Sequence, residues 1–180
     1  GIQMELREGD YIHDDVRYYL GMLGVLVGKW RCTFCHAVAV QAGPLERMPR
    51  VETLDMSDRA THDAAPCSRC LGRNLRNDIA WDYIEPYIQL KEWGIDGHVD
   101  GILWMPFDGT WYLLILEIKS INEAGFMQKY GVIPKPEHIE QASLYAWAWG
   151  APWLYFIYVN KNQVKEWKEI VVRRDAAQVE

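Results

Sequence analysis

The sequence predicts an α/β (α+β) domain in which a β-sheet is flanked by helices. Three observations favour this class: an apolar stripe at helical spacing near the N-terminus, a β-hairpin signal around residues 97–119, and a helical segment after Pro136. With 180 residues, 49% of them hydrophobic, the chain can bury a sizeable core. We expect a single domain, 1–180, that carries one insertion.

Composition narrows the function before any motif is considered. A net charge of −6 argues against a protein that coats DNA electrostatically, so any nucleic-acid contact must be local. The nine Trp and ten Tyr mostly fill a core or an interface, and a few could stack on bases. The sequence has no run of eighteen apolar residues and no signal-peptide pattern at its start, which predicts a soluble, cytoplasmic protein with no membrane partner.

The first element is a helix predicted over residues 10–28. Asp10 is the expected N-cap and Gly28 the expected stop. His13 lies in the first predicted turn, one step off the apolar stripe, where a histidine is usually structural or solvated. The stripe itself consists of Ile12, Val16, Tyr19, Leu20, Leu23 and Val27.

Residues 30–77 are interpreted as the insertion, because they lack sustained periodicity and contain all four cysteines. The cysteines form two C-x-x-C motifs, Cys32 with Cys35 and Cys67 with Cys70. Each motif offers two thiolates from one tight turn, and together they complete the tetrahedral sulfur site that structural Zn²⁺ prefers. An iron–sulfur cluster is the main alternative, whereas disulfides are unfavourable in a reducing compartment.

The hairpin is predicted from its turn. Asp108-Gly109 is typical of a two-residue type I′ turn, and apolar and aromatic residues flank it on both sides. If Phe107 pairs with Thr110, the register of both strands follows by counting outward from the turn.

This register brings charged side chains to one face of the hairpin. Asp100 falls opposite Glu117, and His98 falls opposite Lys119. Two opposed carboxylates repel each other, and a divalent cation between them would reverse that cost. A simple Glu117–Lys119 ion pair is the alternative, but it leaves Asp100 unexplained. The face is therefore a candidate metal site.

Further strands are predicted on either side of the hairpin. Residues 83–90 suit a strand that extends it, with Glu85 as a solvent-facing acid. Residues 111–119, the second strand of the hairpin itself, are apolar on both faces until Glu117, which indicates a buried central strand. Residues 153–159 are a second buried strand.

A second helix is predicted to begin at Pro136 and to end at Gly150. Gln141 and Tyr145 lie at i and i+4, so they share one face of this helix. On spacing alone the pair is an ordinary polar edge.

The order of these elements resembles the PD-(D/E)XK nuclease superfamily and, within it, the RecB-like exonucleases and the CRISPR-associated nucleases that trim spacers. The resemblance covers residues 9–160. It rests on G-x-x-x-H in the first helix, D and then E-x-K on the hairpin, and Q-x-x-x-Y on the later helix. The matching residues are Gly9, His13, Asp100, Glu117, Lys119, Gln141 and Tyr145.

The resemblance implies a restriction-endonuclease-like core, with a central mixed β-sheet flanked by helices. It also implies a metal-dependent DNA nuclease, most simply an exonuclease in bacterial or phage DNA processing or recombination. Mg²⁺ or Mn²⁺ would be held by His13, Asp100, Glu117 and the Ile118 carbonyl. Lys119 would act on the attacking water.

Two further roles follow from the same resemblance. Gln141 would steady the lysine or the water, and Tyr145 would contact the DNA backbone.

In the iron–sulfur members of the family one cysteine precedes the core and three follow it, whereas here all four lie between the first helix and the hairpin. This departure favours zinc. Val99 stands where the family name has proline.

Alternatives remain within and outside this class. The same fold could serve a structure-specific or sequence-specific endonuclease, such as a junction resolvase or a restriction-type enzyme. The alternative outside the enzymes is a zinc-containing module that binds nucleic acid or protein and has no activity. Expected partners are DNA and, in some settings, recombination or replication proteins, and an oligomer is compatible with the aromatic content.

Overall fold

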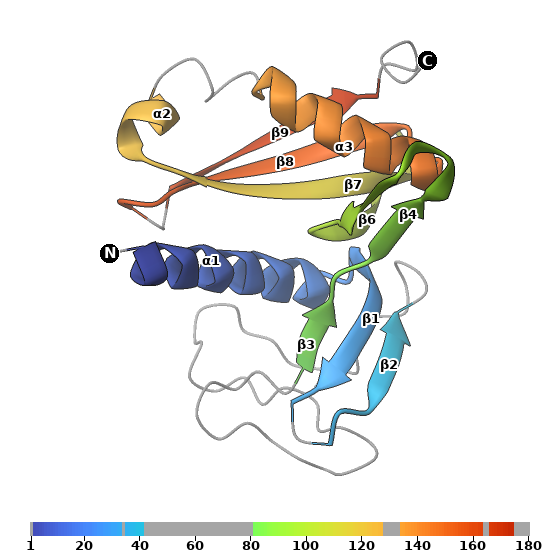
Figure 1. Cartoon of the computed structure of the whole chain (residues 1–180). Coiled ribbons are helices and arrows are strands. Elements are labelled where there is room, and N and C mark those ends of the chain that lie inside the picture. The colour runs from blue at the N-terminus through green and yellow to red at the C-terminus, as the bar shows by residue number, and fades with distance from the viewer. Residues whose placement is uncertain (1, 34, 42–80, 128–133, 164–165, 175–180) are drawn as a thin grey trace.

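The computed structural model describes residues 2–33, 35–41, 81–127, 134–163 and 166–174. Figure 1 shows the arrangement of the elements. The helices are α1 (Ile2–Met22), α2 (Glu123–Met127) and α3 (Pro136–Trp149), with a short 3-10 turn η1 (Lys91–Trp93). The strands are β1 (Leu26–Cys32), β2 (Val38–Gln41), β3 (Trp81–Ile84), β4 (Tyr87–Leu90), β5 (Ile95–His98), β6 (Gly101–Phe107), β7 (Thr110–Ile121), β8 (Trp153–Asn160) and β9 (Trp167–Arg173).

The main sheet is mixed. Its described strands run in the order β2-β1-β6-β7-β8-β9. A further strand of the same sheet, β3, also pairs with β1. β6 and β7 are antiparallel, whereas β7 and β8 are parallel and α3 lies between them in the chain. Strands β4 and β5 form a separate pair. The predicted α+β class, with a mixed sheet flanked by helices, is confirmed.

Helices α1 and α3 cover opposite faces of the sheet (Figure 1). Alternate residues of β7 divide between the two cores, because successive side chains of a strand point to opposite faces. Leu116 and Ile118 pack in one cluster with Ile12 of α1, while Ile115 packs in another with Ala142 of α3. β7 is thus a buried central strand, as its sequence predicts.

The hairpin turn has the predicted geometry. Asp108 and Gly109 have φ angles of 48° and 76°, the positive values that a type I′ turn requires. Pairing runs without interruption from Phe107↔Thr110 to Gly101↔Leu116. The register is therefore confirmed as far as Gly101, and Asp100 lies one residue beyond the last pair.

The predicted bounds of the first helix are wrong at both ends. α1 begins at Ile2, so Asp10 lies inside it and is not an N-cap. It ends at Met22, because Gly24 adopts a left-handed φ of 74° and the chain turns into β1. Gly28 lies within that strand. The physical reason is that Val25 and Val27 are β-branched and favour an extended backbone, so the chain enters β1 rather than continuing the helix.

The strand predicted over 83–90 is two strands in different sheets. β3 pairs with β1 and β4 pairs with β5, and the break falls at Glu85-Pro86. Proline has no N–H to donate and restricts the residue before it, so the ladder cannot continue through this point.

The first strand of the hairpin is also interrupted, because a bend at residue 100 separates β5 from β6. His98 consequently pairs with Tyr87 of β4, and their rings lie 5.1 Å apart. The expected position of His98 opposite Lys119 is wrong.

α3 begins at Pro136 and is followed by Gly150 in the left-handed conformation, as predicted. The predicted insertion, 30–77, begins within β1 and includes β2, while its residues 42–77 lie outside the described part of the chain. Among the described helices, none has the length and apolarity needed to cross a bilayer.

Candidate metal centre

The candidate site forms where β7 runs past the beginning of β6. The last paired residues are Gly101 and Leu116, so β7 beyond Leu116 has no β6 partner. The side chain of Asp100 lies at this edge, and its Oδ2 accepts a hydrogen bond of 2.7 Å from the main-chain N–H of Ile118. The carboxylate therefore satisfies a backbone donor that the sheet leaves unpaired.

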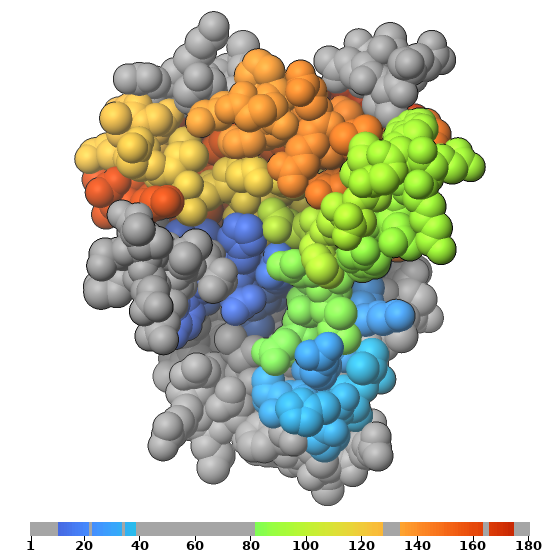
Figure 2. Space-filling view, viewed as in Figure 1, coloured from blue at the N-terminus to red at the C-terminus, as the bar shows by residue number. Residues whose placement is uncertain are grey.

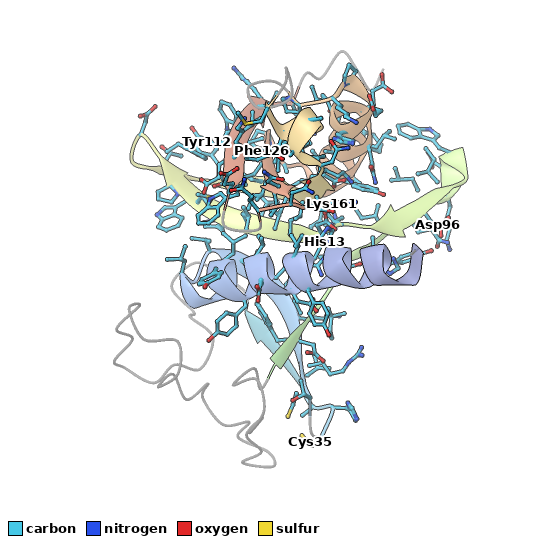
Figure 3. All side chains as sticks on the ribbon, turned by 90° about the vertical axis from the view of Figure 1, so that its left-hand side faces the viewer. His13, Cys35, Asp96, Tyr112, Phe126 and Lys161 are labelled. Atoms are coloured by element: carbon cyan, nitrogen blue, oxygen red, sulfur yellow. The ribbon has the colours of Figure 1, made fainter. Side chains whose placement is uncertain are left out.

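His13 approaches the same carboxylate from α1. Its Nδ1 lies 3.3 Å from Oδ1 of Asp100. In Figure 3, His13 lies on the side of α1 that faces the sheet. The sequence placed His13 and Asp100 in one site only through a family resemblance, and the fold brings them together from segments far apart in the chain.

Asp100 is held in its ionised form. Burial opposes ionisation, but the hydrogen bond and charge of His13, the Ile118 N–H and the Arg17 guanidinium together lower the pKa of Asp100 below its usual value. The site therefore presents a preformed anion at neutral pH.

Glu117 behaves in the opposite way. It is 2% exposed, and burial together with the nearby charge of Asp100 raises the pKa of its carboxyl despite the ion pair with Lys119. Lys119 Nζ contacts Glu117 Oε1 directly. The ion pair that served as the alternative interpretation is thus present, and the repulsion between Glu117 and Asp100 is present as well.

Arg17 and Glu85 belong to this site, although the sequence interpretation missed the first and assigned the second to solvent. Arg17 lies one turn after His13 on α1 and is buried. Its Nε donates to the main-chain oxygen of Asp100 at 2.8 Å, and its Nη2 donates to Oε1 of Glu85 at 2.5 Å. Two features of the sequence could have pointed to these residues: Arg17 lies at i+4 from His13, and Glu85 directly precedes Pro86.

Glu85 completes a group of potential metal ligands. His13, Glu85 and Asp100 each offer a ligand atom, and these atoms all lie within 4.8 Å of one another. They come from α1, from the β3–β4 junction and from the bend before β6. Figure 2 shows the segment from β3 to β5, in green, crossing the surface between the β1–β2 hairpin and α3. Glu117, which we expected in this group, pairs instead with Lys119.

Gln141 and Tyr145 lie on α3 and contact each other. Gln141 is exposed, and its Nε2 is 3.5 Å from the hydroxyl of Tyr145. Tyr145 is buried, with its hydroxyl against β5, where a Cβ at Gly97 would lie 2.5 Å from it. Tyr145 packs in one cluster with Ile115 of β7, so it lies on the side of the sheet that α3 covers.

A histidine–tyrosine pair, not foreseen from the sequence, adjoins Lys119. Tyr158 of β8 is the strand partner of Lys119, and its hydroxyl is 2.7 Å from Nδ1 of His138 on α3. Burial and the charge of Lys119 lower the pKa of His138. A neutral imidazole therefore joins α3 to the strand that lies beside Lys119.

The comparisons with known proteins assign no family. No family model matches the chain, and no curated protein matches it. A solved structure described as "Crystal structure of SSO0001" is similar at 19% identity and a TM-score of 0.32. The match covers 47% of this chain and 35% of that one, so the chain spans about a third of its length.

The cysteine motifs are described in part. Cys32 ends β1 and is buried, and Cys35 lies in the turn that follows. The N–H of His36 donates to the Cys32 carbonyl at 3.0 Å, and His36 has a positive φ of 57°, so the first motif forms a tight turn. Figure 3 shows Cys35 on the opposite side of α1 from Tyr112 of β7. Cys67 and Cys70 lie outside the described residues, and zinc remains a prediction.

The donor set at Asp100 fits a hard divalent cation. Carboxylate oxygens and one imidazole nitrogen are ligands that Mg²⁺ and Mn²⁺ accept, and among the described residues this group contains no cysteine. The Ile118 carbonyl oxygen is a further candidate ligand, because the N–H and C=O of one residue in an extended strand point to the same side and this N–H already reaches Asp100. His13, Glu85 and Asp100 could therefore hold a cation, and the Glu117–Lys119 pair lies on the strand beside them.

Proposed function

We propose that this chain is a metal-dependent deoxyribonuclease of the PD-(D/E)XK type, most simply an exonuclease that hydrolyses phosphodiester bonds in DNA processing or recombination. The observation that carries the proposal is the ionised Asp100, held by His13, next to the buried Glu117–Lys119 pair. A second, structural Zn²⁺ at the four cysteines belongs to the same proposal.

The residues divide into metal ligands and groups that handle the water. His13, Asp100, Glu117 and the Ile118 carbonyl would hold Mg²⁺ or Mn²⁺. Bound there, the ion supplies charge neutralisation at the phosphate and an acidified water. The proximity of Asp100 to Glu117 supports this assignment, because two carboxylates that repel each other become favourable once a cation lies between them.

Lys119 is the proposed catalytic residue for the water. Its Nζ donates a hydrogen bond that orients the attacking water or, as a neutral amine, takes the proton from it, and the ammonium then lies beside the charge that develops on the phosphate. Tyr158 and His138 limit where α3 lies relative to Lys119. Gln141, exposed on α3, steadies the lysine or the water. Tyr145 is assigned the contact to the DNA backbone, for which its hydroxyl, now buried against β5, would have to turn outward.

The test compares three site variants with matched controls on the exposed turn η1. Asp100→Asn, Glu117→Gln and Lys119→Met are expected to lower Mg²⁺-dependent or Mn²⁺-dependent DNA cleavage at least about a hundredfold. Lys91→Met and Glu92→Gln change the same charges at exposed positions and should leave cleavage unchanged. Thermal melts establish that each variant is folded.

The result also separates the alternatives. An exonuclease degrades linear DNA and leaves covalently closed circles intact, whereas an endonuclease nicks the circles. If the folded wild-type protein with Mg²⁺ or Mn²⁺ cleaves no DNA substrate, the enzyme proposal is wrong and the binding-module interpretation stands. Full activity in any one of the three site variants would refute that residue's assignment.

A further inference from the structure

The guanidinium of Arg17 occupies a position among the potential metal ligands. Its Nη2 lies 2.5 Å from Oε1 of Glu85 and 3.3 Å from Oδ1 of Asp100, so one positive group bridges the two carboxylates. The same Oδ1 of Asp100 is the atom that His13 faces at 3.3 Å. A positive group that bridges these oxygens does electrostatically what a bound cation would do there.

We propose that Glu85 is a fourth side-chain ligand of the divalent cation and that Arg17 is an internal competitor, which the cation displaces from Glu85 and Asp100. This inference rests on the proposed metal dependence. It concerns a ligand, Glu85, and a competitor, Arg17, that are not among the residues of the sequence motif. Glu85 enters the group through the β3–β4 junction, where Pro86 ends the ladder.

The contacts of Arg17 allow such an exchange without loss of the helix position. Arg17 Nε donates to the main-chain oxygen of Asp100 at 2.8 Å, and this bond does not involve either carboxylate. Arg17 Nη1 already lies 3.6 Å from Asp14, an exposed acid one turn earlier on α1. A guanidinium that leaves Glu85 therefore has a carbonyl and a carboxylate within reach.

The charges near the site favour the exchange. Asp100, Glu85 and Glu117 carry three negative charges, and Arg17 with Lys119 returns two positive charges. A divalent cation added to this set leaves an excess of positive charge, unless Arg17 turns toward Asp14. Because Glu85 is 39% exposed, its carboxylate can also rotate toward the ion without opening the core.

The experiment measures Mn²⁺ affinity directly by calorimetric titration of the full chain, independently of DNA cleavage. Glu85→Gln removes the ligand charge and is expected to weaken Mn²⁺ binding about tenfold or more. Arg17→Met removes the competitor and is expected to tighten binding about tenfold. Arg17→Lys keeps a charge but cannot bridge both acids, and should lie between wild type and Arg17→Met.

Controls match each change in charge. Glu92→Gln on η1 and Arg31→Met on β1 are exposed and should bind Mn²⁺ within about twofold of wild type, since salt screens distant surface charges. If Arg17→Met is too unstable for titration, the same inference predicts that Mn²⁺ raises its melting temperature more than that of the wild-type protein.

The outcomes are distinct. Wild-type affinity in Glu85→Gln would refute the ligand assignment, and weaker binding in Arg17→Met or a smaller thermal gain would refute the competition, while both results leave the proposed nuclease in place. A wild-type protein that binds no Mn²⁺ would instead overturn both this inference and the proposed function.

Discussion

The main-chain N–H of Ile118 donates a 2.7 Å hydrogen bond to the carboxylate of Asp100. β7 continues to Ile121, whereas β6 begins at Gly101, and the side chain of Asp100 replaces the missing strand at this edge. One carboxylate therefore closes the sheet and stands at the candidate metal site. The contribution of this carboxylate to stability can be measured in the metal-free protein.

Asp100→Asn should lower the free energy of unfolding of the metal-free protein by about 1–3 kcal/mol at neutral pH, because it weakens charge-assisted hydrogen bonds to His13, Arg17 and Ile118. The pKa of Asp100 is lowered in the folded protein, so its contribution is complete above the usual pKa of an aspartate. It is lost as the pH falls through the lowered pKa. Urea unfolding of both proteins across acidic pH should show the two curves converging; equal stability at neutral pH would contradict this account.

Glu117→Gln should have the opposite effect on the metal-free protein, raising its free energy of unfolding by on the order of 1 kcal/mol at neutral pH. The folded pKa of Glu117 is raised by burial and by Asp100, so the wild-type protein loses stability as the pH rises from the usual glutamate pKa through the raised one. Below that window the two proteins should be equally stable. Denaturant titrations with a chelator present measure the difference. A less stable variant at neutral pH would mean that the ion pair with Lys119 outweighs the repulsion.

Gly97→Ala should destabilise the contact between β5 and α3 by about 1–3 kcal/mol, because the added Cβ would lie 2.5 Å from the Tyr145 hydroxyl. Tyr145→Phe removes that oxygen and should recover part of the loss. A double-mutant cycle on chemical unfolding measures the coupling between the two positions. Additive effects would show that the backbone, and not the hydroxyl, limits this site.

Cys32→Ser should release zinc and destabilise the β1–β2 turn, since a structural thiolate site contributes its binding energy to folding. The expected wild-type content is one Zn²⁺ per chain, measured by elemental analysis. A brown protein with visible absorption would favour an iron–sulfur cluster, and the absence of any stoichiometric metal would refute the prediction. Cys35→Ser should reproduce the effect if the two residues share one site.

The local part of the site could be predicted because short-range rules fix it. Asp108-Gly109 needs positive φ at both positions, and the turn then sets the register that brings Asp100 beside Glu117 on β7. The length of α1 could not be read from its stripe, since Asp10 has the residue type of a cap but lies inside the helix.

The residue sequence by itself determined the turn, the central strand with Glu117 and Lys119, and the bounds of α3, because neighbours in the chain fix their backbone angles and periodicity. Only the tertiary structure decided that Arg17 meets Asp100 and Glu85, which are 83 and 68 residues away. It also decided that His98 turns away to pair with Tyr87. The physical reason is that the side-chain period of a segment specifies which face is buried, whereas the partner across that face depends on how the whole chain packs.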